Sequence, residues 1–310
     1  MAAWNELLIE AKSAGSVHDI MRRRYLRLLS AYTKRNTIIY YSGWLQKPEL
    51  LREKAIGPGL GITDADKNGF MSAIYRMVPE KGLDLILHTP GGDMAATESL
   101  IDYLRAKFTD IRAIVPQIAM SGGTIMALSC SQIIMGKGSS IGPIDPQFGP
   151  MSATSLLSEF ERIRSEIQKD PSNALLWEPV LRKLDPGFIT DCENALTWSA
   201  KMAERYLKSG MFKGERKASE KVQRIISHLT ENKKTLMHGR HIGLAEAKTI
   251  FGKHVVELEN DQRLQDLVLS VHHCTIITLQ STAAYKLIEN DKGRAFVLIA
   301  TPQLMISQPA

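Results

Sequence analysis

The chain has 310 residues, of which 44% are hydrophobic and 23% charged, and its formal net charge is +6 at pH 7. This composition is that of a globular protein with a sizeable core, and three widely separated cysteines (Cys130, Cys192 and Cys274) argue against a disulfide scaffold. The basic excess, 39 Lys and Arg against 33 Asp and Glu, is dispersed, so nucleic-acid binding is not expected. Because neither a signal-peptide pattern nor a run of about twenty apolar residues is present, we expect no membrane span and a cytoplasmic location.

Residues 1–36 are predicted to form an N-terminal helical segment, whose second part is basic and amphipathic. Its apolar stripe is expected to dock on its own domain or on a sister subunit, with a membrane surface or nucleic acid as the alternative. Thr37–Trp44, rich in β-branched and aromatic residues, predicts the first core strand. Asp64 begins a pattern like that of a calcium loop, but Tyr75 stands where the closing Glu is needed, so Asp64 is predicted to cap a helix over Lys67–Met77.

The middle of the chain alternates short apolar runs with a helical pattern. Leu83–Leu87, Ile111–Val115 and Gln132–Met135 predict buried strands. Met94–Phe108 carries a helical apolar stripe, and Asp93 is placed to cap it. A second short apolar helix precedes the third strand. Strands joined through helices in this way are expected to pair in parallel with right-handed crossovers.

A glycine-rich corner follows each of the first two strands. These corners are Gly91-Gly92 and Ser121-Gly122-Gly123, and the carboxyl ends of parallel strands meet at one sheet edge, where ligands bind. Glycine exposes bare backbone N–H groups, and a serine hydroxyl beside such donors is what acyl transfer needs. The residues by themselves leave open that both corners are only tight turns, with Ser121 as a helix N-cap.

Three motifs in order carry a resemblance to a known family. They are Thr89-Pro90-Gly91-Gly92, Met120-Ser121-Gly122-Gly123 and Ser140-Ile141-Gly142-Pro143-Ile144-Asp145-Pro146. Together they resemble the Clp/crotonase superfamily, and most closely the serine dehydrogenase proteinases among its S49-type serine peptidases. The likeness runs from about Thr37 to Leu258. It implies an α/β fold built as a spiral of ββα units, and hydrolysis of peptide bonds. A helical insertion and a C-terminal extension that lies outside the likeness are expected in addition, and no cofactor or metal is expected.

The resemblance also implies roles for individual residues. Ser121 matches the nucleophile, and the N–H groups of Gly92 and Gly122 match a two-amide oxyanion hole. Gly91 and Gly123 complete the two corners as supporting residues. A peptide or protein substrate is expected to lie extended beside the first corner, adding a strand through backbone hydrogen bonds. Relatives of this kind assemble into rings or dimers, so a homo-oligomer is implied.

The general base is the least determined part of this site. Asp145 stands where Clp-type enzymes carry a histidine, which rules out a Ser-His-Asp triad with its histidine there; S49 members use a lysine instead. A lysine base must be neutral near pH 7, which requires burial or positive neighbours. Lys137, Lys169 and Lys201 are the candidates. Lys201 lies three residues after Trp198 at the border of an apolar helix face and matches the base of the NfeD-type proteases, with a solvent-exposed surface lysine as the alternative.

The expected organisation is a peptidase domain over residues 37–260, with a helical insertion at about 151–190 beside the active-site mouth. Residues 261–310 form a C-terminal extension of unassigned role, with strands near 271–279 and 295–300. The pairs His238/His241 and His272/His273 lack further ligands at metal-binding spacing.

Two other functions stay open. One is a non-catalytic peptide-binding or scaffold protein of the same fold. The other is a crotonase-like acyl-CoA enzyme, in which Asp93 and Asp145 would supply a carboxylate pair beside the same oxyanion hole.

Overall fold

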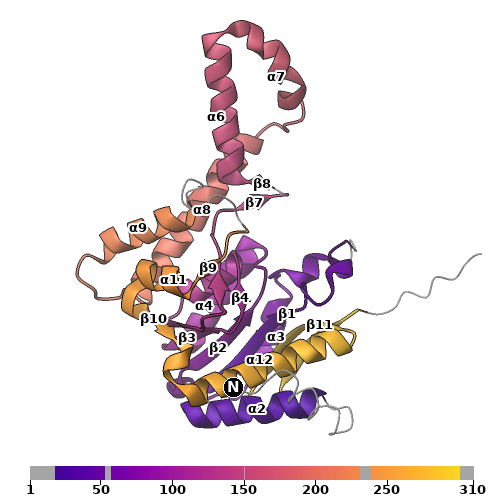
Figure 1. Cartoon of the computed structure of the whole chain (residues 1–310), viewed down its shortest axis with the longest axis vertical. Coiled ribbons are helices and arrows are strands. Elements are labelled where there is room, and N and C mark those ends of the chain that lie inside the picture. Colours follow the sequence, from indigo (N-terminus) through magenta and orange to yellow (C-terminus); the bar gives the residue numbers. More distant parts are fainter. Residues whose placement is uncertain (1–17, 53–56, 150, 231–238, 301–310) are drawn as a thin grey trace, which may run out of the picture.

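The computed structural model describes residues 18–52, 57–149, 151–230 and 239–300. Its centre is a seven-stranded mixed sheet in the order β10-β5-β3-β2-β1-β11-β12 (Figure 1). The strands are β1 (Asn36–Ser42), β2 (Leu83–His88), β3 (Ile111–Val115), β5 (Gln132–Met135), β10 (Val255–Glu257), β11 (Ala284–Asn290) and β12 (Ala295–Ile299). The first five run parallel, whereas β11 is antiparallel to both β1 and β12.

Helices cover both faces of this sheet (Figure 1). One face packs against α2 (His18–Thr33) and α12 (Gln262–Ser281). The other packs against α3 (Asp66–Ile74), α4 (Met94–Lys107), α5 (Gly122–Leu128), α8 (Phe188–Ser209), α9 (Ala218–Thr230) and α11 (Leu244–Phe251). Successive strand residues point to opposite faces, so Leu85 and Leu87 enter the second core while Ile86 enters the first. Strands buried on both faces are continuous apolar runs, so their positions can be recognised in the sequence.

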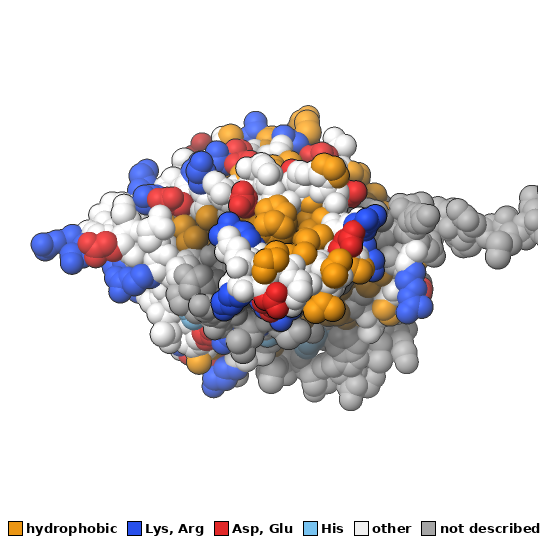
Figure 2. Space-filling model, turned by 90° about the horizontal axis from the view of Figure 1, so that it is seen from above, with side chains coloured by type: hydrophobic (Ala, Val, Ile, Leu, Met, Phe, Trp, Pro, Cys, Tyr) orange, Lys and Arg blue, Asp and Glu red, His pale blue; other side chains and the backbone are white. Residues whose placement is uncertain are grey.

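An arm projects from this body (Figure 1). It comprises α6 (Ala153–Lys169), which packs along α8, and α7 (Ala174–Leu181). Seen along the arm, Figure 2 shows hydrophobic side chains gathered among charged ones, and Leu175 and Leu176 are 76% and 73% exposed. No helix in the described ranges has both the length and the apolar character that crossing a bilayer needs.

Smaller elements connect these parts. β4 (Ile118–Ala119), β6 (Ser140–Ile141) and β9 (Ile242–Gly243) form a three-stranded sheet, and β7 (Gln147–Phe148) pairs with β8 (Met151–Ser152) at the base of the arm. Short 3-10 helices are η1 (Pro48–Arg52), η2 (Gly57–Leu60), η3 (Pro79–Lys81), η4 (Pro171–Asn173), η5 (Gly252–His254) and η6 (Leu258–Asn260).

The α/β class, the three central strands and the Asp93 cap of α4 are confirmed. Two local predictions are wrong. Asp64 does not cap α3, because the N-cap position falls on Ala65 and no side chain caps it. Residues 271–279 lie inside α12 and not in a strand. That stretch is buried nearly all round, and periodicity cannot distinguish a buried helix from a buried strand. The proposed division into domains stays a prediction, although β11 and β12 belong to the same sheet as the central strands.

Candidate active site

The two glycine corners lie against each other, the first directly after β2 and the second after β4, the short strand that follows β3. A Cβ placed on Gly91 would come within 2.7 Å of the Ser121 Cβ and 2.9 Å of the Gly122 nitrogen. One placed on Gly122 would lie 3.5 Å from the Gly92 nitrogen. Only glycine fits at position 91, because its φ of +94° is left-handed and no side chain has room there. The tertiary structure therefore brings one hydroxyl-bearing residue and two glycine N–H groups into one place.

Ser121 has an unusual backbone conformation, with φ +51° and ψ −117°. A non-glycine residue in such a region is strained by about 1–3 kcal/mol and points to a function. Ser121 occupies the N-cap position of α5, yet its side chain makes no capping hydrogen bond. A serine on a sharp, strained strand-to-helix turn is also the arrangement of the nucleophile elbow. The simple N-cap interpretation is therefore disfavoured.

The backbone next to Gly92 directs its N–H group toward the serine corner. The Ile62 N–H donates to the Gly91 carbonyl at 2.7 Å, and the Asp93 N–H donates to the Ile62 carbonyl at 2.9 Å. This parallel bridge leaves the N–H and C=O of Gly92 itself on the opposite edge. Gly122 opens α5, where N–H groups have no intrahelical acceptor. Among the described residues neither N–H has a hydrogen-bond acceptor, so both are available to an oxyanion.

The other residues of the two corners are explained by packing and by helix capping. A Cβ on Gly92 would lie 2.0 Å from the Ile62 nitrogen, and one on Gly123 would lie 2.5 Å from Cγ2 of Thr89. Asp93 accepts from the Ala96 N–H at 2.7 Å, so α4 begins directly after the first corner. Close backbone packing thus holds both corners in register.

None of the three candidate lysines is buried. Lys201 is exposed on α8, Lys169 is exposed at the end of α6, and the side chain of Lys137 is 75% exposed, 4.0 Å from Glu257. Asp145, by contrast, is fully buried. The structure therefore brings Ser121 together with the glycines and leaves the lysine predictions without a buried amine.

The buried lysine of the described chain that the sequence patterns missed is Lys286 on β11. Its side chain is fully buried, and Nζ donates to the Gly61 carbonyl at 2.6 Å and to the two carboxylate oxygens of Asp66 at 2.8 and 2.9 Å. Burial lowers the pKa of Lys286, while the Asp66 carboxylate acts in the opposite direction. Three acceptors use all three ammonium hydrogens, so this amine is not a free base. An ion-pair partner on a helix 220 positions away in the chain cannot be identified from the linear sequence.

A group of histidines lies at the end of β2 but toward the α12 side of the sheet. His88 is fully buried, its ring 4.5 Å from that of Trp44, and burial lowers its pKa to about 3. His272 shares a hydrogen bond of 3.0 Å with the Tyr41 hydroxyl. The described residues contain no group of three His, Cys, Asp or Glu side chains able to hold a metal. Of the other histidine pair, His238 lies outside the described residues, and His241 shares a 2.7 Å hydrogen bond with Ser140.

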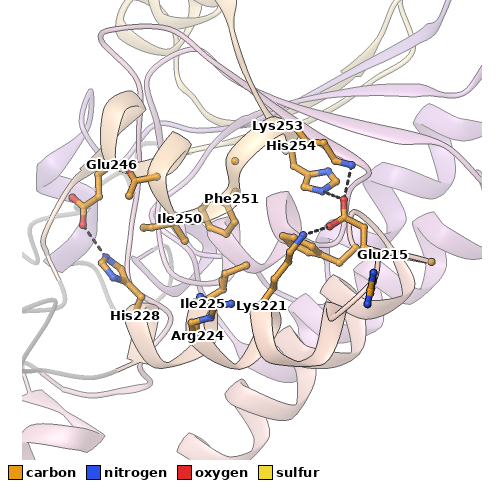
Figure 3. A pocket seen from close by; sticks show the side chains of 15 residues that line it. Glu215, Lys221, Arg224, Ile225, His228, Glu246, Ile250, Phe251, Lys253 and His254 are labelled. Carbon is orange, nitrogen blue, oxygen red and sulfur yellow. Dashed lines mark hydrogen bonds and ion pairs between the residues drawn. The ribbon is translucent and has the colours of Figure 1, made fainter.

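A separate cleft of about 870 Å³ is lined by residues of α9 and α11 and of the loops beside them (Figure 3). None of its lining residues belongs to the two glycine corners. Glu215 accepts from Lys221 at 2.7 Å, Lys253 at 2.6 Å and His254 at 3.1 Å. Hydrogen bonds from Lys221 and Lys253 lower the pKa of Glu215 to about 2. This carboxylate is satisfied by its own neighbours, which marks the cleft as a different kind of region from the Ser121 corner.

Comparison with known proteins bears on the same part of the chain. A family model described as ClpP-like SDH-type serine proteinase matches residues 19–183, just over half of the chain and both glycine corners. Two uncharacterized proteins of Methanocaldococcus jannaschii are similar to this chain: MJ0137 is 41% identical over 101 residues, and MJ1495 is 41% identical over 102 residues. The aligned part is 33% of this chain and 35% of each relative, so the chain spans about a third of the length of the curated relatives it matches.

Proposed function

Because the chain belongs to the family of ClpP-like SDH-type serine proteinases, we propose that it hydrolyses peptide bonds with Ser121 as the nucleophile and the N–H groups of Gly92 and Gly122 as the oxyanion hole. The family predicted from the three motifs and its α/β, Clp-like fold class are confirmed. The observation that carries the residue assignment is the meeting of the two corners around a strained serine that makes no capping hydrogen bond.

The chemistry follows from these groups. The Ser121 hydroxyl oxygen attacks the carbonyl carbon of the peptide, and its proton passes to a base. Negative charge develops on the carbonyl oxygen, where the two N–H groups stabilise it without reorganising. The amine then leaves with a proton, and water hydrolyses the acyl-enzyme by the same steps. Removing one such donor typically lowers kcat by about 10²–10³.

We propose Lys201 as the general base, because the relative direction of helices α4 and α8 favours it. Helices α4 and α8 run side by side in the same direction: the Trp198 indole donates to Glu98 near one end, and Arg105 donates to the Ser209 carbonyl near the other. Helix side chains tilt toward the N-terminus of their helix, which here is the end where α4 leaves the Gly92 corner. A lysine acts as a base only where its charged form is disfavoured, so the proposal requires bound substrate or a second subunit to cover this face of α8.

The same geometry limits where a peptide substrate can bind. One edge of the Gly91–Gly92 corner is already paired with Ile62. A peptide adding a strand there must therefore use the opposite edge, which faces Ser121. We propose a peptide or protein substrate and a homo-oligomeric enzyme.

A fluorophosphonate probe tests the nucleophile. We expect the wild-type protein to be labelled at Ser121, Ser121→Ala to lose labelling, and Ser158→Ala, a matched change of an exposed serine on α6, to keep it. A folded wild-type protein that resists the probe would contradict the peptidase proposal. In that case retained peptide binding would favour the scaffold function, and binding of coenzyme A would favour the crotonase-like one.

A further inference from the structure

Residues Leu60 to Thr63 form a short segment beside the first glycine corner. Its two hydrogen bonds, from the Ile62 N–H to Gly91 and from the Asp93 N–H to Ile62, enclose Gly92. The backbones are in contact, since a Cβ on Gly92 would lie 2.0 Å from the Ile62 nitrogen. The direction of the Gly92 N–H therefore depends on where this segment lies.

Three buried side chains hold the segment at successive points. The Ser42 hydroxyl donates to the Leu60 carbonyl at 2.6 Å, and the Lys286 ammonium donates to the Gly61 carbonyl at 2.6 Å. The Asp66 carboxylate accepts from the Thr63 N–H at 3.0 Å. All three side chains belong to fully buried residues. Anchors of this kind make the segment a fixed part of the site and not a removable lid.

The anchors come from parts of the chain that are far apart in sequence. Ser42 on β1 and Lys286 on β11 are directly opposite in the antiparallel register, and Asp66 opens α3. Asp66 also accepts from the Tyr40 hydroxyl at 2.7 Å. A buried ion pair is a weak source of stability, because desolvation offsets its attraction and apolar residues of similar volume often do as well. What this pair supplies is a defined position for Gly61 and Thr63.

We propose that Lys286, Asp66 and Ser42 are positioning residues for the oxyanion hole. They act through the Leu60–Thr63 segment, which orients the Gly92 N–H toward Ser121. The proposal rests on the function proposed above. It also gives the C-terminal strand β11, whose role the sequence left unassigned, a part in the active site.

The test is the double variant Lys286→Met/Asp66→Asn, which removes both charges while keeping similar volumes. We expect the maximal rate of fluorophosphonate labelling to fall about 10- to 100-fold, since a misplacement of about 1 Å has effects of that size. The probe concentration giving half that rate should change little. Hydrogen exchange at the Ile62 and Asp93 amides should become faster. Ser42→Ala, which removes one hydroxyl and keeps the ion pair, should show the same changes more weakly.

The matched control is Arg22→Met/Glu289→Gln. It removes another fully buried ion pair of β11, but on the opposite face of the sheet. We expect this variant to label Ser121 at nearly the wild-type rate, whatever its change in thermal stability. An equal loss of labelling in the control would overturn the proposal, because the effect would then be one of general stability.

Wild-type labelling and unchanged exchange in Lys286→Met/Asp66→Asn would also overturn it. If that variant does not fold, Ser42→Ala decides by the same two measurements. If the wild-type protein itself resists the probe, the nucleophile assignment fails, and exchange at Ile62 and Asp93 alone decides whether the three anchors hold the corner.

Discussion

The cleft and the glycine corners both contain polar groups, but they differ in what those groups are bonded to. In the cleft between α9 and α11, Glu215 accepts from Lys221, Lys253 and His254, and His228 is paired with Glu246 at 2.9 Å (Figure 3). At the glycine corners the opposite holds: two N–H groups have no acceptor among the described residues, and Ser121 is strained and does not cap its helix. Bonding capacity left unused, together with stored strain, distinguishes a candidate reaction site from a satisfied structural cluster.

The largest effect is expected from substitution of Ser121, which should change catalytic activity and the free energy of unfolding in different ways. Ser121→Gly should abolish peptide hydrolysis, because the attacking hydroxyl is gone, and yet raise the free energy of unfolding by about 1 kcal/mol, because glycine adopts the positive φ without strain. Ser121→Ala should be equally inactive and about as stable as the wild type. Peptidase assays and denaturant unfolding measure both. A Ser121→Gly protein less stable than Ser121→Ala would show that the corner is not strained.

The base assignment predicts the next largest effect. Lys201→Ala should lower turnover by about 10²–10⁴, the usual contribution of general acid–base catalysis. Lys137→Ala, which changes another exposed lysine, should leave turnover unchanged. Steady-state rates with a peptide substrate decide the matter. The reverse result would transfer the role to Lys137, and full activity in both variants would remove lysine from either position as the base.

The close packing of Gly92 against the Ile62 backbone predicts that a substitution at position 92 lowers both the stability of the fold and the labelling of Ser121. Gly92→Ala places a Cβ against the Ile62 backbone, which should destabilise the fold by about 1–3 kcal/mol and move the N–H away from Ser121. Gly138→Ala is the matched control, since a Cβ there meets nothing within 4 Å. Thermal unfolding and probe labelling compare the two. Normal labelling in Gly92→Ala would rule its N–H out of the oxyanion hole.

The smallest effect is expected from a substitution in the cleft, which should change the stability at low pH and not the labelling of Ser121. The pKa of Glu215 is lowered from 4.5 to about 2, so its ionised form contributes stability that is complete above about pH 4.5 and is lost as the pH falls toward 2. Glu215→Gln should lack this part of the acid dependence, and its labelling of Ser121 at pH 7 should equal that of the wild type. Unfolding midpoints between pH 2 and 7 provide the measurement. A loss of labelling would link the cleft to the active site.

Local chemistry made much of the fold predictable. Continuous apolar runs identified β2, β3 and β5, and Asp93 was correctly predicted to cap α4, because these features depend on neighbours only a few residues away. The same reasoning failed for residues 271–279 of α12, where burial on nearly all sides hides the helical period.

The sequence by itself determined that two glycine corners follow two parallel strands and that one of them carries a serine, since turn chemistry is written in adjacent residues. The tertiary structure confirmed the expectation that these corners meet, and it alone decided that Lys201 is exposed and that Lys286 reaches Asp66 beside the Leu60–Thr63 segment. The physical reason is that burial and pairing depend on which distant segments pack together, and hydrophobic patterning specifies which face of a strand is covered but not which residue covers it.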